Sequence, residues 1–286
     1  MPDIMKTMGA RWTRSFRILR GFVDRWVAMH WDRQPIAGMA YGADRFVKIW
    51  SNRSNNLKYN GEFEVISRLH ADLGLVVDVG ANVGDWTAAI RTFAPSAVVH
   101  CFEPEPENAN ILRHRFQGKS VSIHMLALSN HTGTGNLLID SRNSSMNSFT
   151  VRPDMAATMG SLTVPVTTGD QFCEDAQIAT IDLLKVDTEG HDLRVLEGFG
   201  TMLEERRVRV IQFEYNAFSI YSRTLLIDYF ELLEPLGYHL GKLRPNGVEF
   251  HEYHPDRENW IGPDYIAVLD DELELLDKLK IGRKSS

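Results

Sequence analysis

The pattern of apolar and polar positions changes near residue 60. Residues 10–31 carry apolar side chains at helical spacing with arginines between them, which predicts a basic amphipathic helix. Residues 32–60 include a run rich in Ser and Asn and are predicted to be a connector. From residue 61 onward, short apolar runs alternate regularly with helical patterns. We therefore expect a domain at 61–270 preceded by an extension at 1–60.

The regular part of the chain predicts repeated β-α-β units, which build a parallel, doubly wound sheet. We expect strands at 75–79, 98–102, 121–127, 181–186, 208–214, 238–243 and 264–269. Helices are expected at 84–93, 106–116, 191–198 and 223–235. The rhythm breaks at 130–168, predicted to be a hairpin-bearing insertion, and a short helix and tail are expected at 271–286.

Composition and charge narrow the possible functions. Hydrophobic residues make up 43% of the 286 residues and charged residues 24%, as in ordinary globular proteins. Residues 1–60 carry a formal charge of +7 and residues 61–286 carry −14, so we expect no nucleic-acid partner for the acidic domain. Two cysteines cannot make a disulfide framework, and no run of about 20 apolar residues predicts a membrane span. These features predict a cytoplasmic protein.

The turn after the first strand is the most specific motif. Its glycines have the spacing Gly-x-x-x-Gly, which differs from the tighter Gly-x-Gly-x-x-Gly of dinucleotide sites. An acid precedes the first glycine by two residues, which suits a ligand with an amino group and no phosphate, such as the amino-acid end of S-adenosylmethionine. The candidate cofactor contacts are Asp78, Gly80, Ala81, Asn82 and Gly84.

Further candidate residues follow the other predicted strands. Glu103 ends the second strand, where a carboxylate can accept both hydroxyls of a ribose. Ala127 and Leu128 end the third strand and are predicted to flank an adenine. Open α/β sheets place their active sites at this same edge of the sheet. The later strands bring three candidate catalytic residues to it: Asp187, His191 and Glu214.

Taken together, these motifs resemble the FkbM family of S-adenosylmethionine-dependent methyltransferases. The motifs are Val-Asp-Val-Gly-Ala-Asn-Val-Gly at 77–84, Phe-Glu-Pro-Glu-Pro-Glu-Asn at 102–108, Ala-Leu-Ser-Asn at 127–130, Lys-Val-Asp-Thr-Glu-Gly-His at 185–191 and Phe-Glu-Tyr-Asn at 213–216. They occur in family order over about residues 60–270. The chain departs from the family at Gly169, where leucine is usual, and at His191, where tyrosine is frequent.

The resemblance implies a seven-stranded, Rossmann-like class I methyltransferase fold. It also implies that Gly80, Asn82 and Gly84 line the methionine part of the cofactor, that Glu103 binds its ribose, and that Ala127 and Leu128 lie near its adenine. The family includes sugar O-methyltransferases, which implies that this chain methylates a hydroxyl group of a sugar in a glycolipid, polysaccharide or glycosylated natural product. The alternatives are a non-sugar natural product, a peptide or nucleic-acid acceptor, or a non-catalytic scaffold that binds the cofactor.

Two mechanisms are open for a hydroxyl acceptor. In the first, His191 or Asp187 acts as the base that removes the hydroxyl proton. The second follows from a resemblance to metal-dependent macrolide-sugar methyltransferases, and implies that Asp187 and Glu214 hold Mg²⁺, which lowers the pKa of the hydroxyl.

We also make predictions for the segments that cover the site and for the helix at the start of the chain. We expect the insertion, with residues 144–147, and the loop 244–263 to cover the acceptor, with Trp260 or Tyr215 stacking on a sugar. The helix at 10–31 is expected either to pack on the domain or to make a peripheral contact with the inner face of an anionic membrane.

Overall fold

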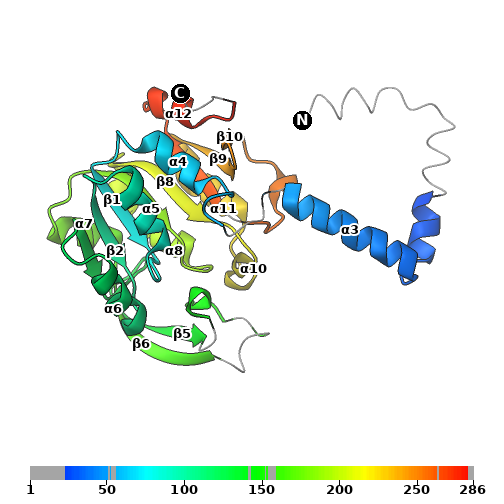
Figure 1. The fold of residues 1–286 in the computed structure, drawn as a ribbon, viewed down its shortest axis with the longest axis horizontal. Helices are drawn as coiled ribbons and strands as arrows, with labels where there is room; N and C mark the ends of the chain where they lie inside the picture. The colour runs from blue at the N-terminus through cyan, green and yellow to red at the C-terminus, as the bar shows by residue number, and fades with distance from the viewer. Residues whose placement is uncertain are drawn as a thin grey trace. The chain divides into compact units, whose positions relative to one another are not determined.

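An eight-stranded sheet forms the centre of the second of two units into which the chain divides, Met1–Trp50 and Ser51–Ser286 (Figure 1). This computed structural model describes residues 23–50, 52, 56–140, 143–151, 153, 159–262 and 264–282. The strand order is β10-β9-β11-β8-β7-β1-β2-β3. The strands are β1 (Leu75–Val79), β2 (Val98–Phe102), β3 (Val121–His124), β7 (Ile181–Val186), β8 (Val208–Glu214), β9 (Tyr238–Arg244), β10 (Gly247–Phe250) and β11 (Asp264–Leu269).

The sheet differs from the predicted parallel, seven-stranded sheet in strand direction and in strand number. The pairs from β3 through β8 are parallel, whereas β11, β9 and β10 pair antiparallel with their neighbours. The predicted number of seven strands is wrong by one, because β10 folds back on β9 within the expected loop 244–263. Pro245 and Asn246 form the two-residue turn between them, since Arg244 pairs with Gly247. The α/β class is confirmed.

Helices cover both faces of the sheet because alternate strand residues are apolar on both sides. Val76 packs with α4 (Glu62–Leu69), α5 (Asp85–Phe93), α6 (Pro106–Arg115) and α12 (Leu273–Leu279) on one face. Val77 packs on the other face with α7 (Gly169–Asp175), α8 (Asp192–Glu197), α9 (Gly200–Glu204) and α11 (Leu226–Leu233). The short helix α10 (Phe218–Ser222) follows β8.

The segment 130–168 contributes most of a second, three-stranded sheet of order β4-β6-β5. It pairs β5 (Gly133–Asp140) antiparallel with β6 (Met159–Thr167), and β6 also pairs with β4 (Ala127–Leu128). The strand expected at 121–127 therefore ends at His124, and Ala127 belongs to the second sheet. A short 3-10 helix at Ser144–Met146 lies in the connection between β5 and β6.

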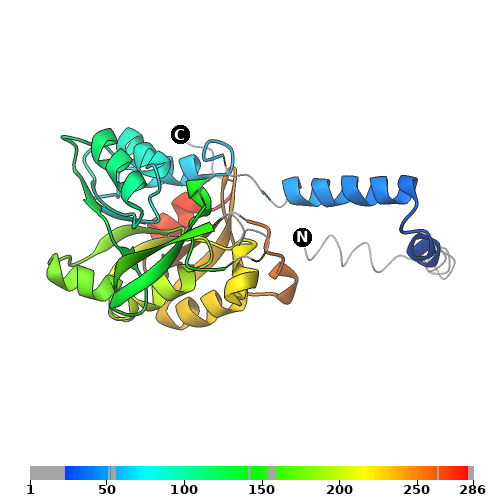
Figure 2. The same cartoon turned by 90° about the horizontal axis from the view of Figure 1, so that it is seen from below.

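The first unit is more helical than its sequence predicts. Residues 10–22 of the expected helix lie outside the described residues, and residues 23–29 are helical. The expected connector is wrong for most of its length, because α3 (Gln34–Trp50) is helical without interruption (Figure 2). Apolar residues recur there every three or four positions, so Gly38 and Gly42 do not end the helix. No described helix is long and apolar enough to cross a membrane.

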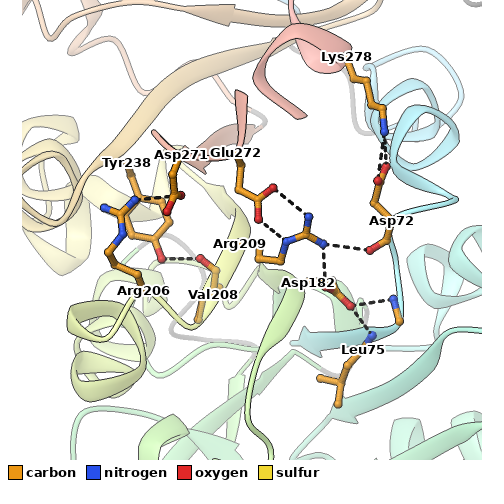
Figure 3. Close-up of polar contacts among 11 residues, drawn as sticks. Asp72, Leu75, Asp182, Arg206, Val208, Arg209, Tyr238, Asp271, Glu272 and Lys278 are labelled. Atoms are coloured by element: carbon orange, nitrogen blue, oxygen red, sulfur yellow. Dashed lines mark hydrogen bonds and ion pairs between the residues drawn. The ribbon is translucent and has the colours of Figure 1, made fainter. Parts of the chain in front are cut away.

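A polar network joins several elements at the amino ends of the central strands (Figure 3). The Asp182 carboxylate accepts hydrogen bonds from the backbone N–H groups of Gly74 and Leu75, both at 2.8 Å. Arg209 of β8 donates to Asp182 at 3.0 Å and binds Glu272, just before α12, through two nitrogens. The network thus links β1, β7, β8 and α12, and leaves the carboxyl ends of the strands to form the site.

We expect Arg209→Ala to lower the free energy of unfolding by about 1–3 kcal/mol, because it removes charged hydrogen bonds from two partly buried carboxylates. Urea denaturation followed by circular dichroism measures the change. Arg113→Ala is the control, since Arg113 is exposed and makes one hydrogen bond to Asn110. Equal stability of the two variants would contradict a structural role for the network.

Candidate active site

A cavity of about 370 Å³ opens at the carboxyl ends of β1, β2, β7 and β8. In open α/β sheets this edge is where ligands bind. The first residue of the antiparallel strand β11 and the start of α4 reach the same cavity. Residues from the segment between β5 and β6 complete its wall. The cavity thus brings together parts of the chain from residue 57 to residue 264.

The turn after β1 forms one wall through its backbone. Gly80 has φ +81°, and a Cβ atom there would overlap the carbonyl oxygen of Asp187, so glycine is required for the close approach of β1 and β7. The N–H groups of Gly80 and Ala81 donate to the carbonyl of Phe102. Gly84, at φ +85°, precedes α5. Gly80, Ala81, Asn82 and Gly84 all line the cavity, as do Ala127 and Leu128 on another wall.

Glu103 lies beside this turn at the end of β2. Its carboxylate accepts hydrogen bonds from the backbone N–H of Asn82 at 2.8 Å and from that of Glu105 at 2.9 Å. Burial raises the pKa of Glu103 to about 7, and the two N–H donors only partly oppose the shift. The residue is thus oriented, faces the cavity and changes charge near neutral pH.

Asp78 does not share this position. Its side chain is 0% exposed and does not line the cavity. Thr87 donates to one carboxylate oxygen at 2.6 Å, and Nζ of Lys185 lies 3.5 Å from the other. Burial raises the pKa of Asp78, and Lys185 opposes that rise. The structure thus surrounds Asp78 with side chains of β7 and α5, behind the turn that it was expected to serve.

Lys185 is a residue of the site to which the sequence motif assigned no role. It is buried, lines the cavity, and places Nζ 3.1 Å from the carboxylate of Asp187. Burial opposes its charge, but Asp187 and Asp78 outweigh that cost and raise the pKa of Lys185 well above its usual value. A lysine within the apolar strand 181–186 was the available signal, because a buried ammonium needs a partner.

Asp187, Glu189 and Glu214 form an acidic cluster that faces the cavity. One carboxylate oxygen of each lies within 4.8 Å of the others. Oε2 of Glu214 is buried without a hydrogen-bond partner. Burial raises the pKa of Glu214 strongly, and the charges of Glu189 and Asp187 add to the effect. The sequence predicted Asp187 and Glu214 as neighbours, and the structure adds Glu189.

His191 also reaches the cavity, in a setting that keeps its imidazole neutral. Nε2 lies 2.9 Å from Oγ of Ser129, and the ring lies against Phe149. Burial lowers the pKa of His191 to about 4, and Arg194 adds to the shift. A histidine with this pKa is a weak proton acceptor at neutral pH.

Two further acids, Glu62 and Asp264, also line the cavity. Nε2 of Gln212 in β8 donates to Glu62 at 2.9 Å and also to Asp264. Burial raises the pKa of both carboxyl groups. Among the described lining residues, Lys185 is the single Lys or Arg. Seven acidic residues also line the cavity: Glu62, Asp85, Glu103, Asp187, Glu189, Glu214 and Asp264. Because carboxyl groups outnumber the single ammonium and an opposite charge favours their ionised form, the cavity suits a cationic ligand.

Of the side chains expected to cover the acceptor, some line the cavity and others do not. Ser144, Ser145 and Asn147 line the cavity, and Asn147 donates to Glu105 at 2.9 Å. Tyr215 is fully buried and donates its hydroxyl to Glu258, so its expected stacking on a sugar is wrong. Trp260 does not line the cavity.

Comparison with known proteins places this site in a family. The methyltransferase FkbM domain matches residues 78–278. The chain is 25% identical over 198 residues to the hexuronic acid methyltransferase AglP of Haloferax volcanii. This alignment covers 65% of this chain and 78% of the relative. It is 29% identical over 157 residues to the 31-O-demethyl-FK506 methyltransferase FkbM of Streptomyces tacrolimicus, covering 43% of this chain and 58% of the relative.

The chain is also similar to a solved structure of a protein named methyltransferase FkbM. The methyltransferase FkbM from Methylobacillus flagellatus KT is 16% identical and aligns with a TM-score of 0.45. The alignment covers 69% of this chain and 44% of that one, so the chain spans less than half of that protein.

We expect Lys185→Met to lower the free energy of unfolding by about 3–5 kcal/mol, because it leaves Asp78 buried without its cation. Adding Asp78→Asn removes that unpaired charge. The double variant should therefore lose less stability than the sum of the single variants, by about 0.5–3 kcal/mol. Denaturant unfolding measures all three, with the exposed Lys119→Met as control. Strict additivity would show that the two residues are not coupled.

Proposed function

The chain belongs to the FkbM methyltransferase family, and we propose that it transfers a methyl group from S-adenosylmethionine to a hydroxyl group of a sugar in a glycolipid, polysaccharide or glycosylated natural product. The observation that carries the proposal is the single cavity onto which the glycine turn, Glu103 and the acidic cluster all open. The sugar acceptor is supported by the similarity to the Haloferax relative, which is a hexuronic acid methyltransferase.

The residues at one end of the cavity fit the cofactor. The carboxylate of Glu103 supplies acceptors for the two ribose hydroxyls, while Ala127 and Leu128 provide apolar contact for an adenine. Backbone atoms at 80–84 border the place for the methionine part. The surplus of carboxylates suits the positive charge of the sulfonium, which a neutral or basic cavity would not stabilise.

When bound, S-adenosylmethionine supplies the methyl group and its own leaving group. The protein then has to orient the acceptor and remove its proton. Alignment contributes several kcal/mol, and a positioned base contributes about 10²–10⁴-fold in rate. We propose that Asp187 takes the proton, or Glu214 once the positive charge of the bound cofactor has lowered its raised pKa. Both carboxyl groups face the cavity, while the low pKa of His191 makes it a weak base.

The same carboxylates also fit the metal alternative. Asp187, Glu189 and Glu214 offer three oxygen ligands, the type that Mg²⁺ prefers. A metal held there would lower the pKa of the acceptor hydroxyl. The buried oxygen of Glu214 without a partner is compatible with either role.

The Streptomyces relative supports a second acceptor class. That protein is named as a methyltransferase of 31-O-demethyl-FK506. An uncharged hydroxyl on such a molecule would meet the same carboxylates.

Binding of S-adenosylhomocysteine should strengthen as the pH rises from 6 to 8, because Glu103 loses its proton near a pKa of about 7 and becomes a better acceptor for ribose hydroxyls. Glu103→Gln should bind about tenfold more weakly at pH 8 and lose this pH dependence. Isothermal titration calorimetry measures both effects. Glu107→Gln, on the exposed start of α6, is the matched control. Absence of binding to the unaltered protein would contradict S-adenosylmethionine as the cofactor, whereas binding without methyl transfer would favour a scaffold over an enzyme.

Turnover of the acceptor should fall about 10²–10⁴-fold in Glu214→Gln or Asp187→Asn if one of them is the base. Assays with EDTA and with added Mg²⁺ separate the two mechanisms. Unchanged turnover in EDTA excludes the metal role, whereas loss that Mg²⁺ restores supports it. Near-normal turnover of both variants would refute both mechanisms. His191→Gln should retain most of the activity, since it is not the proposed base.

The acceptor class is tested by incubating the protein with methyl-labelled S-adenosylmethionine and extracts of glycolipids, polysaccharides and small natural products. Mass spectrometry should find one added methyl group on a sugar hydroxyl. Label on a non-sugar product alone would keep the methyltransferase activity and replace the proposed acceptor.

A further inference from the structure

Helix α3 carries an apolar stripe along most of its length. Positions 36, 39, 40, 43, 46, 47 and 50 are all apolar and share one side of the helix at a period of 3.6 residues. Within this stripe, Met39 is 65% exposed and Phe46 is 68% exposed. The preceding helical residues 23–29 add the exposed side chains of Val23, Trp26 and Val27. Large apolar side chains rarely gather on a surface without a binding role.

The charge of the same segment indicates what covers the stripe. Residues 1–60 contain 11 Lys and Arg against 4 Asp and Glu, whereas residues 61–286 contain 20 against 34. Arg45 and Lys48 lie on the polar side of α3, away from the stripe. A helix with an apolar, aromatic-bearing face and a basic surrounding segment is typical of binding to an anionic lipid surface. Two copies of this segment would instead repel each other through their positive charge.

We propose that α3 lies on the surface of an anionic lipid bilayer, with its stripe of Met39, Phe46 and Trp50 inserted among the headgroups. The aromatic residues suit this position because Trp and Tyr concentrate at membrane–water interfaces. The net positive charge of residues 1–60 attracts the segment to the anionic lipids. Arg45 and Lys48, on the polar side of α3, and the negatively charged domain of residues 61–286 stay in water. This contact is independent of the proposed methyl transfer.

The test is flotation of the full chain with vesicles of phosphatidylcholine containing about 30% phosphatidylglycerol, compared with phosphatidylcholine alone. The protein should float with the anionic vesicles, and high salt should reduce its binding. The double variant Met39→Gln and Phe46→Gln should reduce the bound fraction about tenfold, because it removes two apolar anchors while keeping good helix formers. Tyr41→Gln is the matched control, since Tyr41 is 70% exposed on the opposite side of the helix.

Three results would overturn the proposal. Equal flotation of all variants, or no flotation of the unaltered chain, would exclude a membrane role for the stripe. A concentration-dependent dimer that the double variant abolishes would assign the stripe to a second copy of the chain. A lower thermal transition of the domain in the double variant alone would indicate that α3 packs on its own domain. Calorimetry with S-adenosylhomocysteine on the same samples shows separately whether the cofactor site is intact.

Discussion

The buried ammonium of Lys185 is the interaction on which the rest of the site depends. It lies between Asp78 of β1 and Asp187 at the end of β7, and both carboxylates stabilise its charge. A single buried lysine or aspartate in this sheet would be costly, because desolvation disfavours each charge by itself. Together they join the two central strands at the level where the chain turns into the cavity. Gly80 supports the same junction, because its missing side chain lets the turn pack against the backbone of Asp187.

The acids around this pair would be stabilised in their charged forms by a positive ligand. Glu62, Glu103, Glu214 and Asp264 all have a raised pKa, chiefly because burial disfavours their charged forms. A cation entering the cavity would lower these pKa values, since an opposite charge stabilises the carboxylate. Affinity for a sulfonium and the ability to accept a proton once it is bound therefore arise from the same group of buried carboxyl groups. At the opposite ends of the strands the acids have a cationic partner instead, because Asp182 and Glu272 are both paired with Arg209.

The two units divide the charge of the chain between two environments. The negative domain surrounds a site suited to a cationic cofactor, while the basic segment at 1–60 precedes it with an exposed apolar helix. Taken over the whole chain, the formal charge of −7 would disfavour any anionic surface. That inference applies to residues 61–286 alone. The basic residues of 1–60 and the apolar stripe of α3 instead favour an anionic surface.

The sequence by itself determined the α/β class, the main strands and the cofactor edge of the sheet, because strand periodicity and a glycine turn are local features. It also placed Glu103, Asp187 and Glu214 at the edge where the cavity opens, since each directly follows or ends a strand. It did not reveal the partnership of Asp78 with Lys185, or the approach of Glu62 and Asp264, which are 202 residues apart and meet through Gln212. These groups come from different elements, and only the order and register of the strands bring them together. The buried position of Tyr215 and the low pKa of His191 were likewise decided by tertiary packing, because burial depends on what surrounds a residue and not on its neighbours in the chain.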